Sequence, residues 1–566
     1  MIDTSISSCT NSNASLGIDQ ACFSILNLYI NPVIFYAIAW GAYTGTGVPL
    51  ATLEPKSNTS LIISTKYPLH IYYQTVEPHK NYEYCHTTYT FKEYGSYGWN
   101  ISNADICSNI YVIHEPRNSY FPILTAFMIY MLLAVTWTTS KVIIRVIRGK
   151  LSPNNVYDDL NRLQEENTTH PVIRVTKFSS RIQSVDAFRG IAILLMIFVN
   201  NGGGKYVFFN HSAWFGLSVA DLILPWFAWI MGMSITISKR AELRLTTSRV
   251  KITLCCLRRS AILILLGLML NSIDSKSLND LRFPGILQLL AVSYFVCAIL
   301  ETIFMKPHSQ FGRFAIFRDI LDSWPQWLIM AGIMTTHTLI TFFLHIPNCP
   351  TGYFGPGGKY HYRGKYMNCT AGAAGYIDRL IFGNHTYSKI KDSIYGQILH
   401  YDPEGLMNTI SAIFIVYLGV HAGKILLLYY QANARLIRWF LWAVFTGIIA
   451  GILCNFESEG GVIPVSKRMM TLSYVLTCSS FAFLLYALLY FLIEYKQFWS
   501  GAPFIYAGIN PIFLYVGHVL TKDLFPWAWN IAHPSHASLL AMNLWTTTLW
   551  AIIAYLLYRK DIIITI

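Results

Sequence analysis

Long apolar runs separated by short polar segments recur from about residue 119 to the end of the chain. A helix that crosses a bilayer needs about 20 mostly apolar residues, and eleven runs reach that scale. Their centres lie near Leu132, Leu195, Ile230, Ile264, Val292, Met334, Ile415, Ile448, Leu484, Phe513 and Ile553. The pattern predicts a polytopic α-helical membrane protein with about eleven transmembrane helices.

Residues 1–118 follow a different pattern, because they are polar and rich in Tyr and Thr. Short alternating runs such as "SLIISTKY" and "TYTFKEYG" are typical of strands and predict a small β-rich domain. An apolar stretch at residues 26–40 is broken by Asn27, Asn31 and Pro32, so we interpret it as strand rather than as a membrane span. The start "MIDTSISSCTNSN" lacks the basic residues of a signal peptide, and we expect that a leader is missing.

Charge and glycosylation signals predict the orientation. Basic loops such as "KVIIRVIRGK" and "KRAELRLTTSRVKITLCCLRR" alternate with less basic ones, and the positive-inside rule places the basic loops in the cytosol. Sequons on the other side lie at Asn13, Asn58, Asn100, Asn368 and Asn384. We therefore expect a lumenal amino terminus and a cytosolic carboxyl terminus. A further sequon at Asn167 lies on the cytosolic side and is expected to stay unused.

The predicted organisation has five parts. They are a lumenal β-rich domain (1–118), a first transmembrane helix (119–138), a cytosolic loop (139–188), a transmembrane core (189–558, with a lumenal loop at 346–404) and a cytosolic tail (559–566).

Composition agrees with a lipid environment, because 54% of the residues are hydrophobic and only 13% are charged, against about 25% charged in soluble domains. The net charge of +13 lies in loops between apolar runs, which argues against nucleic acid as its partner. Eleven cysteines are present, and the first bridges we expect are Cys85 with Cys107 and Cys349 with Cys369, although sequence leaves the connectivity open. No CxxC or His-rich spacing indicates a metal site.

Ionisable residues inside a membrane are costly and therefore mark candidate functional sites. The densest cluster is "SVDAFRGIAILLMIFVNNGGGKYVFFNHSAWFGLSVADLILPW". Asp186 and Arg189 lie three residues apart and share one helix face. They form either a local ion pair or a charged lining for an anionic cofactor, with Arg189 suited to a phosphate.

Three further residues of this cluster can carry acyl-transfer chemistry. The imidazole of His211 can deprotonate an amine or carry an acyl group, although a lone histidine is more often packed in the core. Asn200 offers an amide donor to an oxyanion or simply caps its helix. Asp221 can orient an imidazole, bind a sugar hydroxyl or serve as a helix-entry charge.

The remaining candidates have structural readings of equal or greater weight. Lys424 can meet a phosphate from the cytosolic side or extend its amine to the membrane surface. Asp402 and Glu404 can hold a glucosaminium ion or cap the next helix. The run "GINPIFLYVGH" should kink a span at Asn510 and bring His518 into the membrane.

Several segments in order along the chain resemble the heparan-α-glucosaminide N-acetyltransferase family. They include "RIQSVDAFRGIAILLMIFVNNGGGKYVFFNHSAWFG", "CPTGYFGPGGKY", "YDPEGLMNTISAIF", "GVHAGKILL" and "AYLLYRKDI". The resemblance implies a lumenal β domain followed by eleven helices, in a homodimer of the lysosomal membrane. It implies transfer of acetyl from cytosolic acetyl-CoA to the non-reducing terminal glucosamine of heparan sulfate. The family's active-site histidine falls on His211, and its companion asparagine falls on Asn200.

The chain departs from the family pattern at two positions. Leu289 stands where relatives commonly carry an arginine, and Asn201 stands where they often carry an aromatic residue. A sequon also overlaps the expected catalyst at Asn210, and we expect it to stay unmodified. The other classes to weigh are a transporter of acetyl-CoA or a sugar, an acyltransferase acting on a different glycan and an inactive relative. One concentrated site without a clear inverted repeat favours an enzyme.

Overall fold

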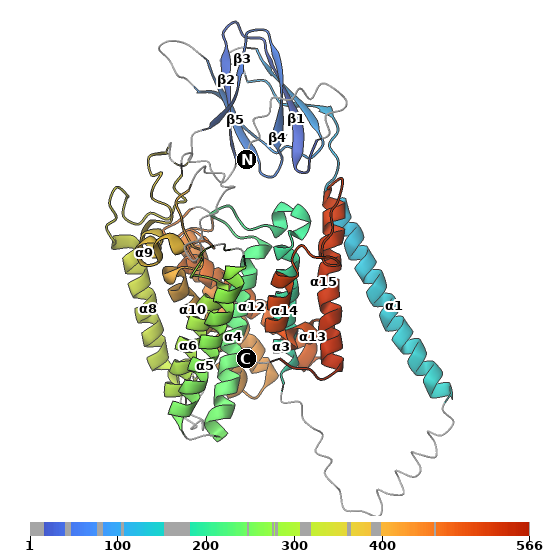
Figure 1. The fold of residues 1–566 in the computed structure, drawn as a ribbon, viewed down its shortest axis with the longest axis vertical. Helices are drawn as coiled ribbons and strands as arrows, with labels where there is room; N and C mark the ends of the chain where they lie inside the picture. The colour runs from blue at the N-terminus through green and yellow to red at the C-terminus, as the bar shows by residue number, and fades with distance from the viewer. Residues whose placement is uncertain are drawn as a thin grey trace, which may run out of the picture.

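The computed structural model describes residues 16–39, 47–75, 83–102, 107–151, 181–245, 248–273, 275, 277, 281–305, 318–358, 361, 364–386, 398–457 and 460–564. These residues form an amino-terminal β domain that lies over one end of a helical bundle (Figure 1). The sequons at Asn13 and Asn167 and the thiol of Cys9 lie outside the described residues.

The β domain consists of two four-stranded sheets, with strand orders β4-β1-β7-β8 and β3-β2-β5-β6. The strands are β1 (Gln20–Asn27), β2 (Val33–Ala39), β3 (Val48–Leu53), β4 (Asn58–Ser64), β5 (Leu69–Thr75), β6 (Glu83–Tyr89), β7 (Ser96–Ile101) and β8 (Tyr111–His114). Phe23, Phe35 and Trp99 pack edge to face or stacked between the sheets. The strand interpretation of residues 26–40 is confirmed by β1 and β2. The expected Cys85–Cys107 disulfide is also confirmed.

Eleven helical segments follow the predicted apolar runs. They are α1 (Phe121–Leu151), α3 (Gln183–Asn200), α4 (Val219–Leu245), α5 (Arg249–Ser272), α6 (Ile286–Phe304), α8 (Trp324–Phe343), α10 (Leu406–Leu428), α11 (Ala432–Cys454), α12 (Leu472–Tyr490), the broken pair α13 (Phe504–Ile509) with α14 (Pro511–Leu520), and α15 (His536–Arg559). Over the described part of the chain, nine helices are long and apolar enough to cross a membrane. The prediction of a polytopic helical membrane protein is confirmed.

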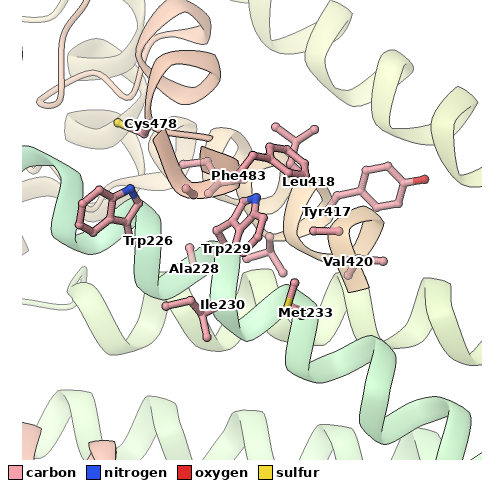
Figure 2. Packing of buried hydrophobic residues seen from close by; sticks show 14 of the residues in the cluster. Trp226, Ala228, Trp229, Ile230, Met233, Tyr417, Leu418, Val420, Cys478 and Phe483 are labelled. Carbon is pink, nitrogen blue, oxygen red and sulfur yellow. The ribbon is translucent and has the colours of Figure 1, made fainter. Parts of the chain in front are cut away.

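The bundle is centred on α4 and α10, which cross at very short range. A Cβ atom added at Gly232 would lie 1.9 Å from the carbonyl oxygen of Val416, and one added at Gly419 would lie 1.8 Å from that of Trp229. Small residues at such crossings let backbones approach where lipid supplies no hydrophobic driving force. Figure 2 shows Trp226, Trp229 and Met233 of this core.

The predicted kink at Asn510 is present, because α13 ends at Ile509 and α14 begins at Pro511. The side chain of Asn510 is fully buried, donates to the carbonyl of Ile562 at 2.9 Å and accepts from the amide of Ile564 at 2.9 Å. The break is thus satisfied internally by the carboxyl-terminal segment, as the absence of water in a bilayer requires.

Candidate active site

The loop between α3 and α4 carries the expected catalyst. Helix α3 ends at Asn200, and Gly202 and Gly204 follow with φ values of 107° and 69°, a conformation that favours glycine. Two short 3-10 turns, η1 (Gly203–Lys205) and η2 (Val207–Phe209), then lead the chain to His211. The glycine run therefore reverses the chain at the end of the bundle that faces the β domain (Figure 1).

His211 is oriented by Asp221. Their Nδ1 and Oδ1 atoms lie 2.8 Å apart, and the Asp221 side chain is fully buried at the start of α4. Its other oxygen accepts hydrogen bonds from Ser212 N (3.2 Å), Ser218 N (3.1 Å) and Ser218 Oγ (2.9 Å). Because the carboxylate accepts a hydrogen bond from Nδ1–H, a neutral His211 keeps its lone pair on Nε2. This is the tautomer that a nucleophile or general base needs.

Lys467 is a member of the site that sequence analysis missed. Its Nζ lies 2.9 Å from Nδ1 and 3.1 Å from Nε2 of His211, and 3.8 Å from Oδ1 of Asp221. Burial lowers the pKa of His211, Asp221 raises it, and Lys467 lowers it further. The only sequence signal was the basic pair "SKR", which lies about 250 positions away from His211 along the chain.

Two cavities meet at His211. The first, here called the bundle cavity, has a volume of about 330 Å³ and extends between α3, α4, α5, α6 and α14. The second, here called the domain cavity, has a volume of about 370 Å³ and is lined by the loop before α4, the start of α4, Phe481 of α12 and Tyr67 of the β domain. Among the described residues that line the two cavities, His211 is common to both. The His211 side chain is 46% exposed, whereas the Asp221 carboxylate that binds it is fully buried.

The far end of the bundle cavity is basic. Arg181, Arg189 and Arg259 all line it. Arg189 and Asn200 are eleven residues apart on α3, which separates the basic end from the histidine end by about 16 Å. Arg181 and Arg259 were missed as individual site residues, although both belong to basic stretches that were recognised as loops or loop edges.

Arg189 forms the local ion pair and also lines the bundle cavity, while its contact with an anionic cofactor stays a prediction. It forms an ion pair with Asp186 at 3.1 Å, donates to Ser234 Oγ at 2.8 Å and donates to the carbonyl of Gly508 at 3.0 Å. The side chain is therefore held by three acceptors while it lines the cavity. Asp186 supports this arrangement and is not itself part of the cavity lining.

Asn200 lines the bundle cavity beside His211 and is held by His518 of α14. The Nδ2 atom of Asn200 lies 3.1 Å from Nε2 of His518, whose Nδ1 lies 3.2 Å from the carbonyl of Leu514. Since Nδ1 must donate to that carbonyl, Nε2 accepts, and the Asn200 amide group must be the donor. Its remaining N–H can address a group in the cavity.

The structure places Lys424 away from this site. Its Nζ forms an ion pair with Glu301 Oε1 at 2.8 Å and also binds Gln326, and Lys424 lines neither cavity. A buried counter-charge on α6 thus accounts for this lysine, because an unpaired ammonium at that depth would be costly.

The two candidate carboxylates before α10 differ. Asp402 is fully buried and bound through both oxygens by Arg282, at 2.7 and 2.5 Å. Glu404 also pairs with Arg282 but lines the bundle cavity, and burial raises its pKa. Glu404 is therefore accessible to a ligand, whereas Asp402 is buried and holds the Arg282 side chain in place.

The expected Cys349–Cys369 disulfide is confirmed and closes the loop that follows α8. Over the described residues, no three His, Cys, Asp or Glu side chains gather as a metal site.

Comparisons with known proteins agree on one family. Residues 181–349 match the family model described as "Heparan-alpha-glucosaminide N-acetyltransferase, catalytic". The human protein named heparan-alpha-glucosaminide N-acetyltransferase is 39% identical over 517 residues, which cover 85% of this chain and 77% of the human protein. The mouse protein of the same name is 38% identical over 515 residues, which cover 84% of this chain and 77% of the mouse protein.

Proposed function

The chain belongs to the heparan-α-glucosaminide N-acetyltransferase family, and we propose that it moves acetyl from acetyl-CoA to the terminal glucosamine of heparan sulfate at the lysosomal membrane. The observation that carries this proposal is the position of His211, which lines two cavities that otherwise share no described residue. Such a position lets the acetyl group pass between substrates that approach from opposite sides. Neither CoA nor the polysaccharide then has to cross the membrane.

The bundle cavity suits acetyl-CoA. Its basic end, with Arg181, Arg189 and Arg259, offers guanidinium groups to the phosphates of the cosubstrate. The walls between this end and His211 are mostly apolar and suit the pantetheine arm. The thioester would then lie beside the Nε2 atom of His211 and the free N–H of Asn200.

Two chemical routes start from this arrangement. In the first, Nε2 of His211 attacks the thioester, CoA leaves as the thiolate, and the acetyl-imidazole is then attacked by the amine of glucosamine. In the second, His211 takes a proton from the amine as the amine nitrogen attacks the thioester carbonyl, the C–S bond breaks and CoA leaves as the thiolate. In both routes Asn200 donates to the developing oxyanion. Asp221 orients the ring and stabilises the positive charge that develops on it.

The domain cavity suits the acceptor sugar. Tyr67 and Phe208 supply aromatic faces, and Asn210 supplies an amide close to His211. Glu404 lines the bundle cavity together with His211. Its carboxylate can bind the amine of glucosamine once the amine has reached the His211 ring. Asp402 acts on the acceptor only through Arg282.

Orientation and assembly are part of the same proposal. The β domain lies in the lumen, the carboxyl terminus lies in the cytosol, and the chain forms a homodimer. The domain boundaries proposed are those at residues 118, 138, 188 and 558. The exposed sequon residues Asn58 and Asn368 are available on the lumenal side for glycosylation, and loss of glycan from N58Q and N368Q after expression would support that side.

The test is transfer of radiolabelled acetyl from acetyl-CoA to a terminal glucosaminide by the purified chain and by His211→Ala. We expect transfer by the wild type and none above background by the variant, with acetyl-CoA binding retained by both. A folded wild type that binds acetyl-CoA without acetylating the glucosaminide would move the assignment to a transporter or to another acceptor.

A further inference from the structure

The proposed chemistry requires a neutral imidazole in an acid compartment. An ordinary histidine has a pKa near 6.5, so most of its rings carry a second proton in acid medium and have no lone pair to offer. Asp221 aggravates the problem, because a carboxylate at 2.8 Å favours the charged ring. Burial opposes protonation of His211, and a positive charge held against the ring would oppose it further; this inference rests on the proposed function.

Lys467 is placed to do so. Its ammonium lies 2.9 and 3.1 Å from the two ring nitrogens of His211. The Nδ1–H bond and the Nε2 lone pair point in diverging directions within the ring plane, so an ammonium nearly equidistant from the two nitrogens lies along neither direction. Lys467 therefore places a positive charge close to the ring without occupying the Nε2 lone pair.

We propose that Lys467 is a positioning residue that keeps the His211 imidazole unprotonated, and its Nε2 atom available to the acetyl group, in an acid compartment. A second proton on the ring would place two positive charges in direct contact, which a partly desolvated site resists strongly. The one exchangeable positive charge stays on lysine, whose ordinary pKa lies about four units above that of histidine. With Asp221 negative, Lys467 positive and His211 neutral, the three side chains carry no net charge.

The other charged groups around the ring act in both directions. Arg468, adjacent to Lys467, also lowers the pKa of His211, while Asp221 raises it. Burial lowers the pKa of Lys467 itself, and the carboxylates of Asp221 and Glu404 raise it. The net shift of the Lys467 pKa is downward, the two carboxylates oppose that shift, and the ammonium opposes protonation of the histidine.

The backbone around Lys467 is pinned to the histidine loop. Ser466 Oγ donates to the carbonyl of Trp214 at 2.8 Å, and Arg468 Nε donates to the carbonyl of Ala213 at 2.9 Å. The two neighbours of Lys467 therefore bind residues two and three positions after His211. These two hydrogen bonds hold the ammonium next to the ring. A lysine needed only for solubility would extend into water instead.

The experiment titrates His211 without using activity. Diethyl pyrocarbonate acylates only neutral imidazole, and mass spectrometry of the peptide containing residue 211 reports its rate in the solubilised full-length chain, with His211→Ala as the blank. In the wild type we expect rapid modification at about pH 5. In Lys467→Met we expect a drop of about tenfold or more at that pH and recovery near pH 7.5, because each unit of pKa above the pH removes about tenfold of the neutral ring. Lys467→Arg should keep the wild-type profile.

Acetyl transfer by the same variants gives the second readout. The acid limb of the rate profile should move to higher pH in Lys467→Met and stay in place in Lys467→Arg. A modification profile unchanged by Lys467→Met would overturn the proposal, as would an equal loss of transfer at every pH. If the modification profile shifts but no variant or wild type transfers acetyl, the electrostatic role stands and the proposed reaction fails.

Discussion

Two groups of histidine, lysine and carboxylate side chains occur in this protein, and they differ in their access to solvent and ligands. The site group is His211, Asp221 and Lys467. The closed group lies between α6, α8, α10 and the short helix α7 (Arg318–Leu321), and it consists of His421, Asp319, Lys424, Glu301 and Gln326. Both have a histidine near an aspartate, at 2.8 Å in the site group and 3.5 Å in the closed group.

Access separates the two groups. His421 is fully buried, with Trp327 and Trp442 packed edge to face on its ring, and it lines neither cavity. His211 is half exposed and lines both cavities. The same residue types therefore stabilise the bundle where the ring is buried, and in the proposed active site they leave the histidine ring open to a ligand.

The largest expected effect follows from replacing each histidine in turn. His211→Ala should lower acetyl transfer by about 10²–10⁴-fold or more, the range that a positioned acid–base group contributes. His421→Gln should keep the turnover of folded protein within a few-fold and lower the thermal unfolding temperature. Comparable losses of turnover per folded molecule in the two variants would erase the distinction between the groups.

Breaking the buried ion pair tests the closed group directly. Lys424→Met leaves Glu301 buried without its partner, which typically costs about 3–5 kcal/mol of folding free energy. Adding Glu301→Met should restore most of that stability, because paired apolar replacements remove both charges. The measurement is thermal unfolding of the wild type and the two variants, with acetyl-CoA affinity as the control. A weaker affinity in the doubly substituted, stable protein would return Lys424 to the cosubstrate site.

The basic end of the bundle cavity tests whether the open cavity, unlike the closed group, binds acetyl-CoA. Arg259→Gln should weaken acetyl-CoA binding by about tenfold, as expected for the loss of a charge-assisted contact with a phosphate. Arg258→Gln is the matched control. Arg258 is the neighbour of Arg259 on α5, is exposed and lines neither cavity. Equal dissociation constants for the two variants, measured by calorimetry, would refute the assignment of the basic end.

A buried carboxyl outside the spans gives the smallest expected effect. Burial raises the pKa of Asp378, in α9 (Gly372–Phe382), from 3.8 to about 7, because no partner fully compensates its charge. The folded state thus holds a proton that the unfolded state releases, so this contribution to stability is present in acid and is lost as the pH rises to about 7. Asp378→Asn should flatten the fall in unfolding temperature between about pH 4 and pH 7. A slope as steep as that of the wild type would exclude this carboxyl as its source.

Apolar patterning was sufficient to predict the helices, because a bilayer requires long apolar segments and satisfied backbones. It also predicted the kink at Asn510, since proline removes a donor. His211, Asn200 and Arg189 came from one continuous segment and from the family resemblance. Asp221 was expected with several roles, and the geometry favours orientation of the ring.

Lys467 and Lys424 show what sequence could not supply. Each lysine lies near an apolar run, with a histidine or a serine close by in the sequence. These local patterns are too similar to assign one lysine to the site and the other to the core. Their partners come from other elements: Glu301 on α6 neutralises Lys424, and the loop before α12 brings Lys467 to His211. Side-chain chemistry in a bundle is decided by contacts between segments hundreds of residues apart, which local periodicity does not encode.

We propose that acetyl alone passes from one cavity to the other at His211. Sealed vesicles that hold the chain, with doubly labelled acetyl-CoA outside and a glucosaminide enclosed, allow this passage to be measured. We expect labelled acetyl on the enclosed sugar while all labelled CoA stays outside, and no transfer with His211→Ala. Labelled CoA inside the vesicles, or acetylation that survives His211→Ala, would contradict it.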